Sequence, residues 1–149
     1  MITLSQKGID LIKYYEKCSL KAYLCPAKRW TIGWGNTFYE GNVPVKDGDK
    51  ITQERADALF TMIVNDFVKS VDAMVHSNIT ENQFAALVSF AYNTGIGNIK
   101  SSTLLKMVNS NPNEPLIRNE FMKWVRANGK VLKGLQKRRA AEADLYFAN

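Results

Sequence analysis

The stretch YYEKCSLKAYLCPAKRWTIGWGNT (residues 14–37) joins the end of a helical pattern to a short hairpin pattern, and this junction decides the fold. Upstream of it, Ser5 is a favourable N-cap for a helix over residues 6–16. On a helical wheel Glu16 falls on the apolar arc beside Ile12. A carboxylate there is either solvated in a frayed last turn or held half-buried, and the wheel leaves both interpretations open.

The second half of the stretch predicts a β-hairpin, with strands over residues 22–25 and 30–34 and a turn over 26–29. Alternation places large apolar side chains on one face and small ones on the other: Trp30, Ile32 and Trp34 against Thr31, Gly33 and Gly35. Glycine inside a strand marks either a close approach by a ligand or a bend. From the sequence both remain open.

The rest of the chain has a mostly helical pattern. The segment 38–50 is polar and rich in turn residues, with room for another short strand. Thr52 is the expected N-cap of a long helix, and Thr80 with Gln83 forms a capping box before an apolar helix that Gly95 ends. Shorter helices are expected over about 102–109, 115–128 and 135–148.

These elements predict an α+β fold in one domain, residues 1–149, with a cleft between its two parts. The parts are a small N-terminal β-rich lobe and a larger helical lobe, joined by the long helix. Their expected ranges are about 17–50 for the β-rich lobe, 53–77 for the connecting helix and 80–149 for the helical lobe.

Composition narrows the partners. The chain is 46% hydrophobic with a net charge of +6, so an anionic polymer such as nucleic acid, a membrane surface or the bacterial cell wall is a suitable partner. The N-terminal residues lack the apolar core of a signal peptide, and no apolar run has the length of a membrane span. We therefore expect a product without signal peptide or membrane span that either stays in the cytoplasm or leaves it by a route that these residues do not encode.

Cysteine and histidine are scarce. Cys18 and Cys25 are the only cysteines and His76 is the only histidine, and their spacing matches no zinc template. We expect no metal and no cofactor. At most one Cys/His pair remains for nucleophilic catalysis.

The order Glu16, Cys25, Thr31, with eight and five residues between them, resembles the phage-type lysozymes, the endolysins of glycoside hydrolase family 24. The similarity runs nearly end to end. LIKYYEKCSLKAYLCP and WTIGWGNT resemble that family's catalytic helix and hairpin, and FAALVSFAYNTGIGNIKSSTLLKMVN resembles its central helix and substrate-facing loop. GLQKRRAAEADLY resembles its closing basic helix.

The resemblance implies a mostly helical lysozyme-like fold and a muramidase. The bond cut would be the β-1,4 link between N-acetylmuramic acid and N-acetylglucosamine in peptidoglycan, with inversion at the anomeric carbon. Glu16 would be the general acid, because partial burial on an apolar helix face raises a carboxyl pKa. Cys25 and Thr31 would place or activate the water, and the glycine face of the hairpin would leave room for a sugar.

Three positions depart from the family's usual pattern. Cys25 stands where Asp is commonest; an ordinary thiol, with a pKa of about 8.5, is little ionised at neutral pH, so we assign Cys25 a water-positioning role. Cys18 lies seven residues upstream, and a disulfide between the two would block the site. Lys28 replaces a turn glycine, at a cost of about 1 kcal/mol if its φ is positive, and Asn36 replaces a histidine.

Further roles follow from the same resemblance. Residues that border the cleft in the family, and are predicted to bind substrate here, are Thr37, Tyr92, Asn93 and Ser102. Trp124 is expected to pack, and the basic run Lys130, Lys133, Lys137, Arg138 and Arg139 to form a solvated face. The chain would act as a monomer on peptidoglycan, after release from the host cytoplasm through a membrane lesion made by a holin-type protein.

Three other functions stay open at this point. A basic helical module could bind nucleic acid, although no recognition-helix pattern is present. Cys25 and His76 could form the pair of a cell-wall peptidase or amidase. A lysozyme-like wall binder could have lost catalysis through the cysteine at position 25.

Overall fold

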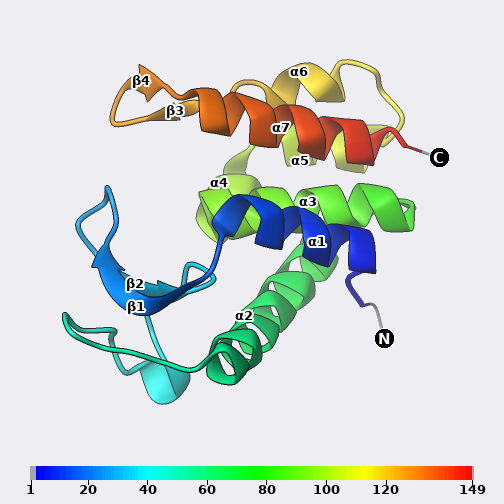
Figure 1. The fold of residues 1–149 in the computed structure, drawn as a ribbon. Helices are drawn as coiled ribbons and strands as arrows, with labels where there is room; N and C mark the ends of the chain where they lie inside the picture. The colour runs from blue at the N-terminus through cyan, green and yellow to red at the C-terminus, as the bar shows by residue number, and fades with distance from the viewer. Residues whose placement is uncertain (1–2, 149) are drawn as a thin grey trace. The chain divides into compact units, whose positions relative to one another are not determined.

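The computed structural model describes residues 3–148, and Figure 1 shows the course of the chain. In chain order the elements are α1 (Gln6–Glu16), β1 (Ser19–Leu24), β2 (Trp30–Gly33), the 3-10 turn η1 (Glu40–Asn42), α2 (Gln53–Met74), α3 (Glu81–Thr94), α4 (Ile96–Ser101), α5 (Thr103–Ser110), α6 (Ile117–Phe121), β3 (Arg126–Ala127), β4 (Lys130–Val131) and α7 (Lys133–Tyr146). The predicted mostly helical α+β class is confirmed.

The chain forms two compact units, Lys13–Asp66 and the pair of segments Met1–Ile12 and Phe67–Asn149. The division falls within α1 and within α2. Both helices begin as predicted, because the hydroxyl of Ser5 accepts from the Gly8 amide at 3.3 Å and that of Thr52 from the Arg55 amide at 3.1 Å.

The unit Lys13–Asp66 is built on the predicted hairpin. β1 begins three residues earlier than expected and pairs antiparallel with β2, with Tyr23 opposite Thr31 and an irregular register between Ser19 and Tyr23. Ala22, Ile32 and Val45 form its small core. Among the described residues of 38–50 there is no regular strand; η1 and single bridges, such as Phe38 with Pro44, hold this segment.

The predicted alternation ends at Gly33. This residue has a φ of +64°, and Ile32 and Asn36 exchange backbone hydrogen bonds of 2.8 and 2.9 Å around the turn. Trp34 therefore leaves the face that Trp30 and Ile32 share. Its indole N–H donates to Asp57 at 2.9 Å instead.

The glycine face does not offer the predicted space at Gly33. A side chain there would meet Asn36 Oδ1 at 3.3 Å and both Ala56 and Ile51 at 3.7 Å. Of the two interpretations of this glycine, the bend is the one the structure supports. Asn36 itself is fully buried, and its amide oxygen and nitrogen have no hydrogen-bond partner among the described residues. Such an orphaned group costs roughly 1–3 kcal/mol.

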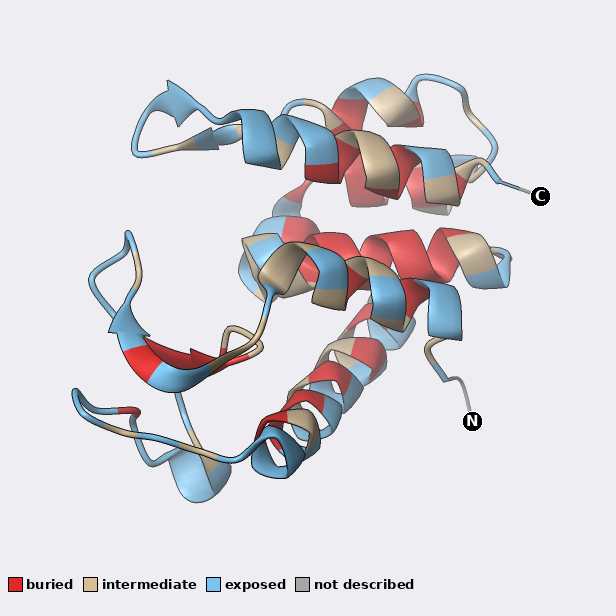
Figure 2. Ribbon diagram, viewed as in Figure 1, coloured by how far each residue is buried: buried red, intermediate tan, exposed pale blue. Residues whose placement is uncertain are grey.

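The other unit is organised around α3. The Thr80–Gln83 capping box is present, with hydrogen bonds of 2.9 and 3.0 Å, and Gly95 closes the helix with a φ of +100°. α3 packs against α7, and Gly8 brings α1 close to Ala85. Figure 2 shows α3 buried along most of its length. The ring of Trp124 packs edge-on against Phe90, as expected.

Two predictions for this unit were wrong. The helix expected over 115–128 ends at Phe121, and the β3–β4 hairpin follows it. Asn128 and Gly129 both have positive φ at its turn, a combination that Asn-Gly pairs favour, so the sequence carried a signal for this hairpin. Arg138 and Arg139, expected in a solvated face, are buried against Glu142.

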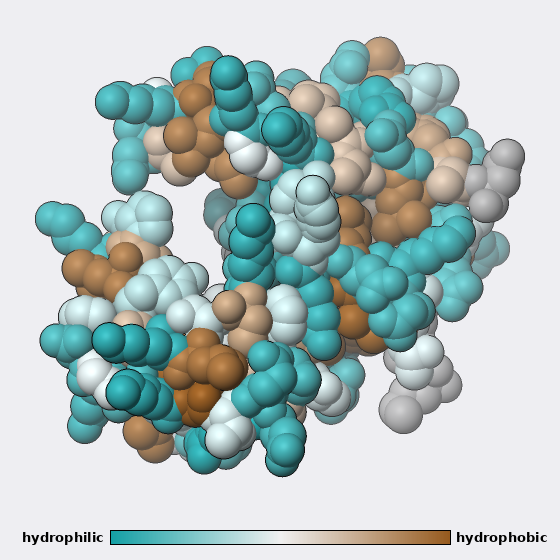
Figure 3. All heavy atoms as spheres, in the orientation of Figure 1, coloured by the Kyte–Doolittle hydropathy of each residue, from teal (hydrophilic) through white to brown (hydrophobic). Residues whose placement is uncertain are grey.

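The visible surface is mainly hydrophilic. Figure 3 shows hydrophobic side chains there only in small separate groups. In residues 3–148, no helix combines the length and the apolar character that a bilayer crossing demands.

Candidate functional site

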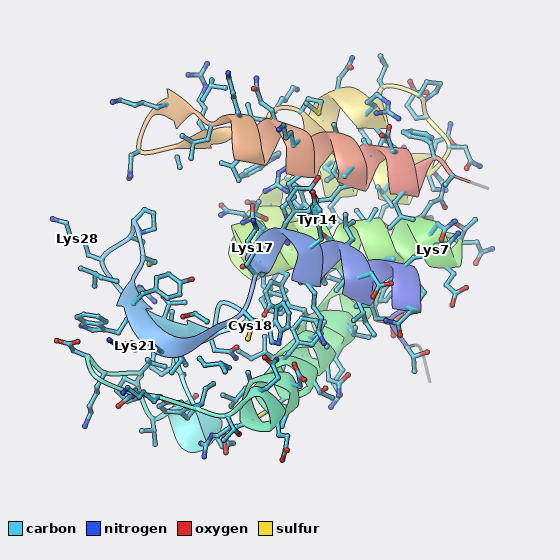
Figure 4. All side chains as sticks on the ribbon, in the orientation of Figure 1. Lys7, Tyr14, Lys17, Cys18, Lys21 and Lys28 are labelled. Atoms are coloured by element: carbon cyan, nitrogen blue, oxygen red, sulfur yellow. The ribbon has the colours of Figure 1, made fainter. Side chains whose placement is uncertain are left out.

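The three predicted catalytic residues all belong to the unit Lys13–Asp66. Glu16 is the last residue of α1 and is half-buried. Lys17 follows it with a φ of +55° and donates its amide to the Lys13 carbonyl at 3.1 Å, so α1 ends with a left-handed residue directly after the acid. This turn sends the chain from Glu16 into β1, with Cys18 at the junction in Figure 4.

Cys25 lies in the turn that connects β1 to β2. Its amide donates to the Arg29 carbonyl at 3.0 Å, and its carbonyl accepts from the Lys28 amide at 2.8 Å. Lys28 has a φ of +62°, so the condition under which this lysine costs about 1 kcal/mol relative to glycine is met. Its side chain points away from the turn in Figure 4. The lysine therefore occupies a backbone conformation that favours glycine.

The Cys25 thiol is more acidic than an ordinary cysteine. Burial by itself would raise its pKa, but hydrogen bonds from the Arg29 backbone, the Thr31 hydroxyl and the Ala27 backbone outweigh burial and lower the pKa. These donors stabilise the thiolate because each points positive charge at the sulfur. An ordinary thiol pKa was expected for Cys25 from the sequence, but the hydrogen bonds of the turn lower it.

Thr31 connects the thiol to the backbone. Its side chain is buried in β2, with 4% exposed, and its hydroxyl donates to the Arg29 carbonyl at 3.0 Å. The same hydroxyl hydrogen-bonds Cys25. It carries one proton, so it can accept from a neutral thiol while donating to the carbonyl, or turn and donate to a thiolate.

Tyr23 is a member of this neighbourhood that the sequence analysis missed. Burial raises the pKa of its hydroxyl, and the negative charges of Glu16 and Cys25 raise it further. Those charges reach the phenol only because the three side chains share one region of the unit. The signal in the sequence was the hairpin register, since Tyr23 precedes Cys25 by two residues and faces Thr31.

The second cysteine, Cys18, differs from Cys25. Burial raises the pKa of its thiol and the charge of Asp57 adds to the rise, against a hydrogen bond from Gln53 and the charge of Lys13. Both cysteines are free thiols in this structure. In residues 3–148 there is no group of three His, Cys, Asp or Glu side chains suited to hold a metal ion.

The predicted substrate-binding residues fall into both units. Thr37 is partly exposed, and its carbonyl accepts from the Val45 amide at 3.0 Å. In the other unit, Tyr92 packs against Phe67, Asn93 accepts a hydrogen bond from Arg139, and Ser102 is buried.

Ser102 is the N-cap of α5. Its hydroxyl accepts from the Leu105 amide at 3.0 Å and donates to the Ile99 carbonyl at 2.7 Å. These two bonds use the hydroxyl's single proton and one of its lone pairs within the protein.

Comparison with known proteins adds relatives along nearly the whole chain. The phage lysozyme family model matches residues 13–142. An endolysin of Bacillus phage B103 is 43% identical over 148 residues, which cover 98% of this chain; the chain spans about half (54%) of that relative's length.

Two solved structures are also similar. The endolysin from Escherichia coli O157:H7 phage FAHEc1 has a TM-score of 0.88 and 37% identity, covering 98% of this chain and 94% of its own. The muramidase domain of SpmX from Asticaccaulis excentricus has a TM-score of 0.86 and 35% identity, covering 100% of both chains. The fold is therefore the lysozyme-like one that the motifs predicted. Since the family model spans most of the residues and these relatives match nearly the whole of this chain, the chain belongs to the phage lysozyme family.

Proposed function

We propose that this chain is a glycoside hydrolase, an endolysin muramidase that cleaves the β-1,4 bond between N-acetylmuramic acid and N-acetylglucosamine in peptidoglycan. The observation that carries the proposal is the grouping of Glu16, Cys25 and Thr31 in one unit of a phage lysozyme family member. Similarity to a muramidase domain supports the same reaction class. The similar proteins do not support the two alternatives, a nucleic-acid-binding module and a Cys/His peptidase.

Glu16 acts as the general acid. Cleavage requires a proton on the glycosidic oxygen as the bond breaks, and a carboxylic acid supplies it best when its environment favours the neutral form. Glu16 lies half-buried at the end of α1, in the same unit as Cys25 and Thr31.

Cys25 and Thr31 act on the water. In an inverting reaction the water attacks the anomeric carbon from the face opposite the acid, and a basic group removes its proton. The lowered pKa of Cys25 makes a thiolate available at lower pH than an ordinary cysteine would. Thr31 supports that thiolate from its buried place in β2, and the thiolate's negative charge also faces the developing positive charge of the sugar.

The deciding experiment digests purified peptidoglycan under reducing conditions and analyses the soluble fragments for new reducing ends and anomeric configuration. Wild type is expected to release inverted N-acetylmuramic acid ends. Glu16→Gln should lower the rate by roughly a hundredfold to ten-thousandfold, because it removes the proton donor. Asp10→Asn, an exposed carboxyl on the same helix, is the matched control and should keep full activity.

Other outcomes of this digestion point elsewhere. New amino groups without reducing ends would replace the muramidase with a peptidase or amidase. An inactive wild type, with Cys25→Asp gaining activity, would mean that the cysteine at position 25 has abolished catalysis. The chain would then be a lysozyme-like protein that binds the cell wall without cleaving it. Equal loss in Asp10→Asn and Glu16→Gln would remove the special role of Glu16.

The wider setting follows from the same proposal. The chain would leave the host cytoplasm through a lesion made by a holin-type protein and lyse the cell as a monomer. In cells that express it, lysis should then begin only when the inner membrane is permeabilised. Lysis without permeabilisation would exclude this route.

The substrate contacts of Thr37, Tyr92, Asn93 and Ser102 remain predictions. The two internal hydrogen bonds of Ser102 favour a capping role over a substrate role.

A further inference from the structure

Tyr23 lies on the same side of the hairpin as the two groups proposed to act on water. It stands opposite Thr31 in the β1–β2 register, and cross-strand partners have Cβ atoms about 5 Å apart. Cys25 follows two residues later, one residue past the end of β1, and its amide still pairs with the Arg29 carbonyl at 3.0 Å. The alternation of the strand therefore extends to Cys25 and places it on the face of Tyr23. The register irregularity between Ser19 and Tyr23 lies just upstream. Bulges of this kind re-aim the side chains that follow them and recur beside active sites.

The phenol is also close to the proposed acid. The charge of Glu16 contributes to the raised pKa of the Tyr23 hydroxyl, after burial and ahead of Cys25. Glu16 is the last residue of α1 and Cys25 lies in the hairpin turn. Tyr23 is therefore near both the proposed proton donor and the thiol proposed to act on the water. A sugar that presents its scissile bond to Glu16 and its anomeric carbon to the water beside Cys25 would lie against this side chain.

The hydroxyl of Tyr23 is available to a ligand. Its side chain is 40% exposed, and the described residues of the unit Lys13–Asp66 offer its hydroxyl no hydrogen-bond partner. Two other tyrosine hydroxyls are used within the protein: Tyr39 donates to Asp49 at 2.8 Å and Tyr146 to the Pro112 carbonyl at 2.6 Å. Tyr23 thus combines an open donor with a position among the reacting groups.

We propose that Tyr23 is a further substrate-contacting residue of this site, whose hydroxyl donates a hydrogen bond to an oxygen of the sugar at the cleavage point. The inference rests on the proposed muramidase function. The phenol stays protonated at neutral pH, because burial and two negative neighbours oppose its ionisation. It therefore serves as a neutral donor throughout the reaction and leaves the proton transfers to Glu16 and Cys25.

The test replaces only the hydroxyl. Tyr23→Phe is expected to lower kcat/KM on peptidoglycan by roughly tenfold to hundredfold, the loss of one donor to the reacting sugar. The melting temperature should not change, because the removed group has no partner in its unit, and the pH midpoints of kcat/KM should stay in place. Tyr14→Phe is the matched control, an exposed tyrosine on α1 labelled in Figure 4, and should behave as wild type.

A binding measurement separates this inference from the proposed reaction. In the Glu16→Gln background, calorimetry would compare the affinity for a soluble disaccharide–peptide fragment of peptidoglycan with and without Tyr23→Phe. A severalfold weaker affinity, or the fall in kcat/KM, supports the contact even if the cleavage chemistry proves different. If both quantities stay within twofold, the inference is wrong. The inference is also wrong if Tyr23→Phe shifts the pH midpoints of kcat/KM while the maximal kcat/KM is unchanged. Tyr23 would then act on Glu16 instead of on the sugar.

Discussion

At the residue scale, the two cysteines show how local structure changes the chemistry of one residue type. Cys25 lies in a turn whose donors lower its pKa, whereas burial raises the pKa of Cys18. Only the thiolate is a good nucleophile, so the two side chains should differ in reactivity over a range of pH. Their positions in one unit make each the internal reference for the other.

We predict that iodoacetamide alkylates Cys25 at lower pH than Cys18, severalfold faster at pH 7.5, as followed by peptide mass spectrometry. Below its lowered pKa the Cys25 thiol is protonated, so its rate should fall only at a pH where Cys18 is already unreactive. Thr31→Val removes one donor to the sulfur while keeping the side chain's shape. It should move the Cys25 profile upward in pH and leave that of Cys18 in place. Coincident profiles for the two cysteines would contradict the assigned role of the turn.

At the element scale, α7 is attached to α3 by a buried ionic cluster. Glu142 is fully buried; it accepts from Ser89 at 2.6 Å on α3 and from Arg139 at 2.5 Å and Arg138 at 3.3 Å on its own helix. Arg138 also donates to the Ser89 carbonyl at 3.1 Å. One buried carboxylate thus binds two guanidinium groups that are themselves almost fully buried, and its bond to Ser89 links α7 to α3.

Glu142→Gln should lower the free energy of unfolding by about 3–5 kcal/mol, because it removes the buried carboxylate that both guanidinium groups bind. Chemical denaturation measures this change. The control is Asp144→Asn on the same helix, whose carboxylate is 72% exposed and pairs with Arg118 at 2.9 Å; its loss should cost at most about 1 kcal/mol. Equal effects of the two variants would show that burial does not set the strength of the cluster.

At the scale of the whole molecule, the excess positive charge is concentrated in one part of the chain. Between residues 121 and 141 there is no Asp or Glu, and five exposed cations fall there: Lys123, Arg126, Lys130, Lys133 and Lys137. They lie on the segment after α6, the β3–β4 hairpin and the first turns of α7. A local field of one sign attracts an anionic polymer such as the cell wall.

Binding to purified cell walls should therefore weaken with salt between 0.05 and 0.5 M, since screening shortens the reach of exposed charges. The double variant Lys130→Glu/Lys133→Glu should reduce pelleting with walls severalfold at low salt. Lys7→Glu/Lys69→Glu changes the net charge equally on α1 and α2 and should have a smaller effect. If both variants lose the same amount, net charge and not the local cluster governs attachment.

The sequence by itself determined where helices begin and which family motifs are present. Caps at Ser5, Thr52 and Thr80 started their helices where expected, because a side-chain oxygen three residues before an orphan amide satisfies it whatever lies further away. The spacing of Glu16, Cys25 and Thr31 predicted the family and the residues that the structure groups in one unit. The same comparison of motifs singled out Lys28, in place of a turn glycine, as a position of possible positive φ, and the structure gives it a φ of +62°.

Only the tertiary structure decided what depends on neighbours distant in sequence or on exact backbone angles. Gly33 bends the chain instead of leaving space, since Ala56 and Ile51 occupy the volume a side chain would take. Arg138 and Arg139 are buried because α7 packs against α3, where Ser89 binds both Arg138 and Glu142, and a helical wheel of α7 does not contain Ser89. The acidity of Cys25 and the place of Tyr23 arise from donors and charges that the folded hairpin gathers around them. Periodicity gives the face of a residue, whereas its pKa depends on partners that packing supplies.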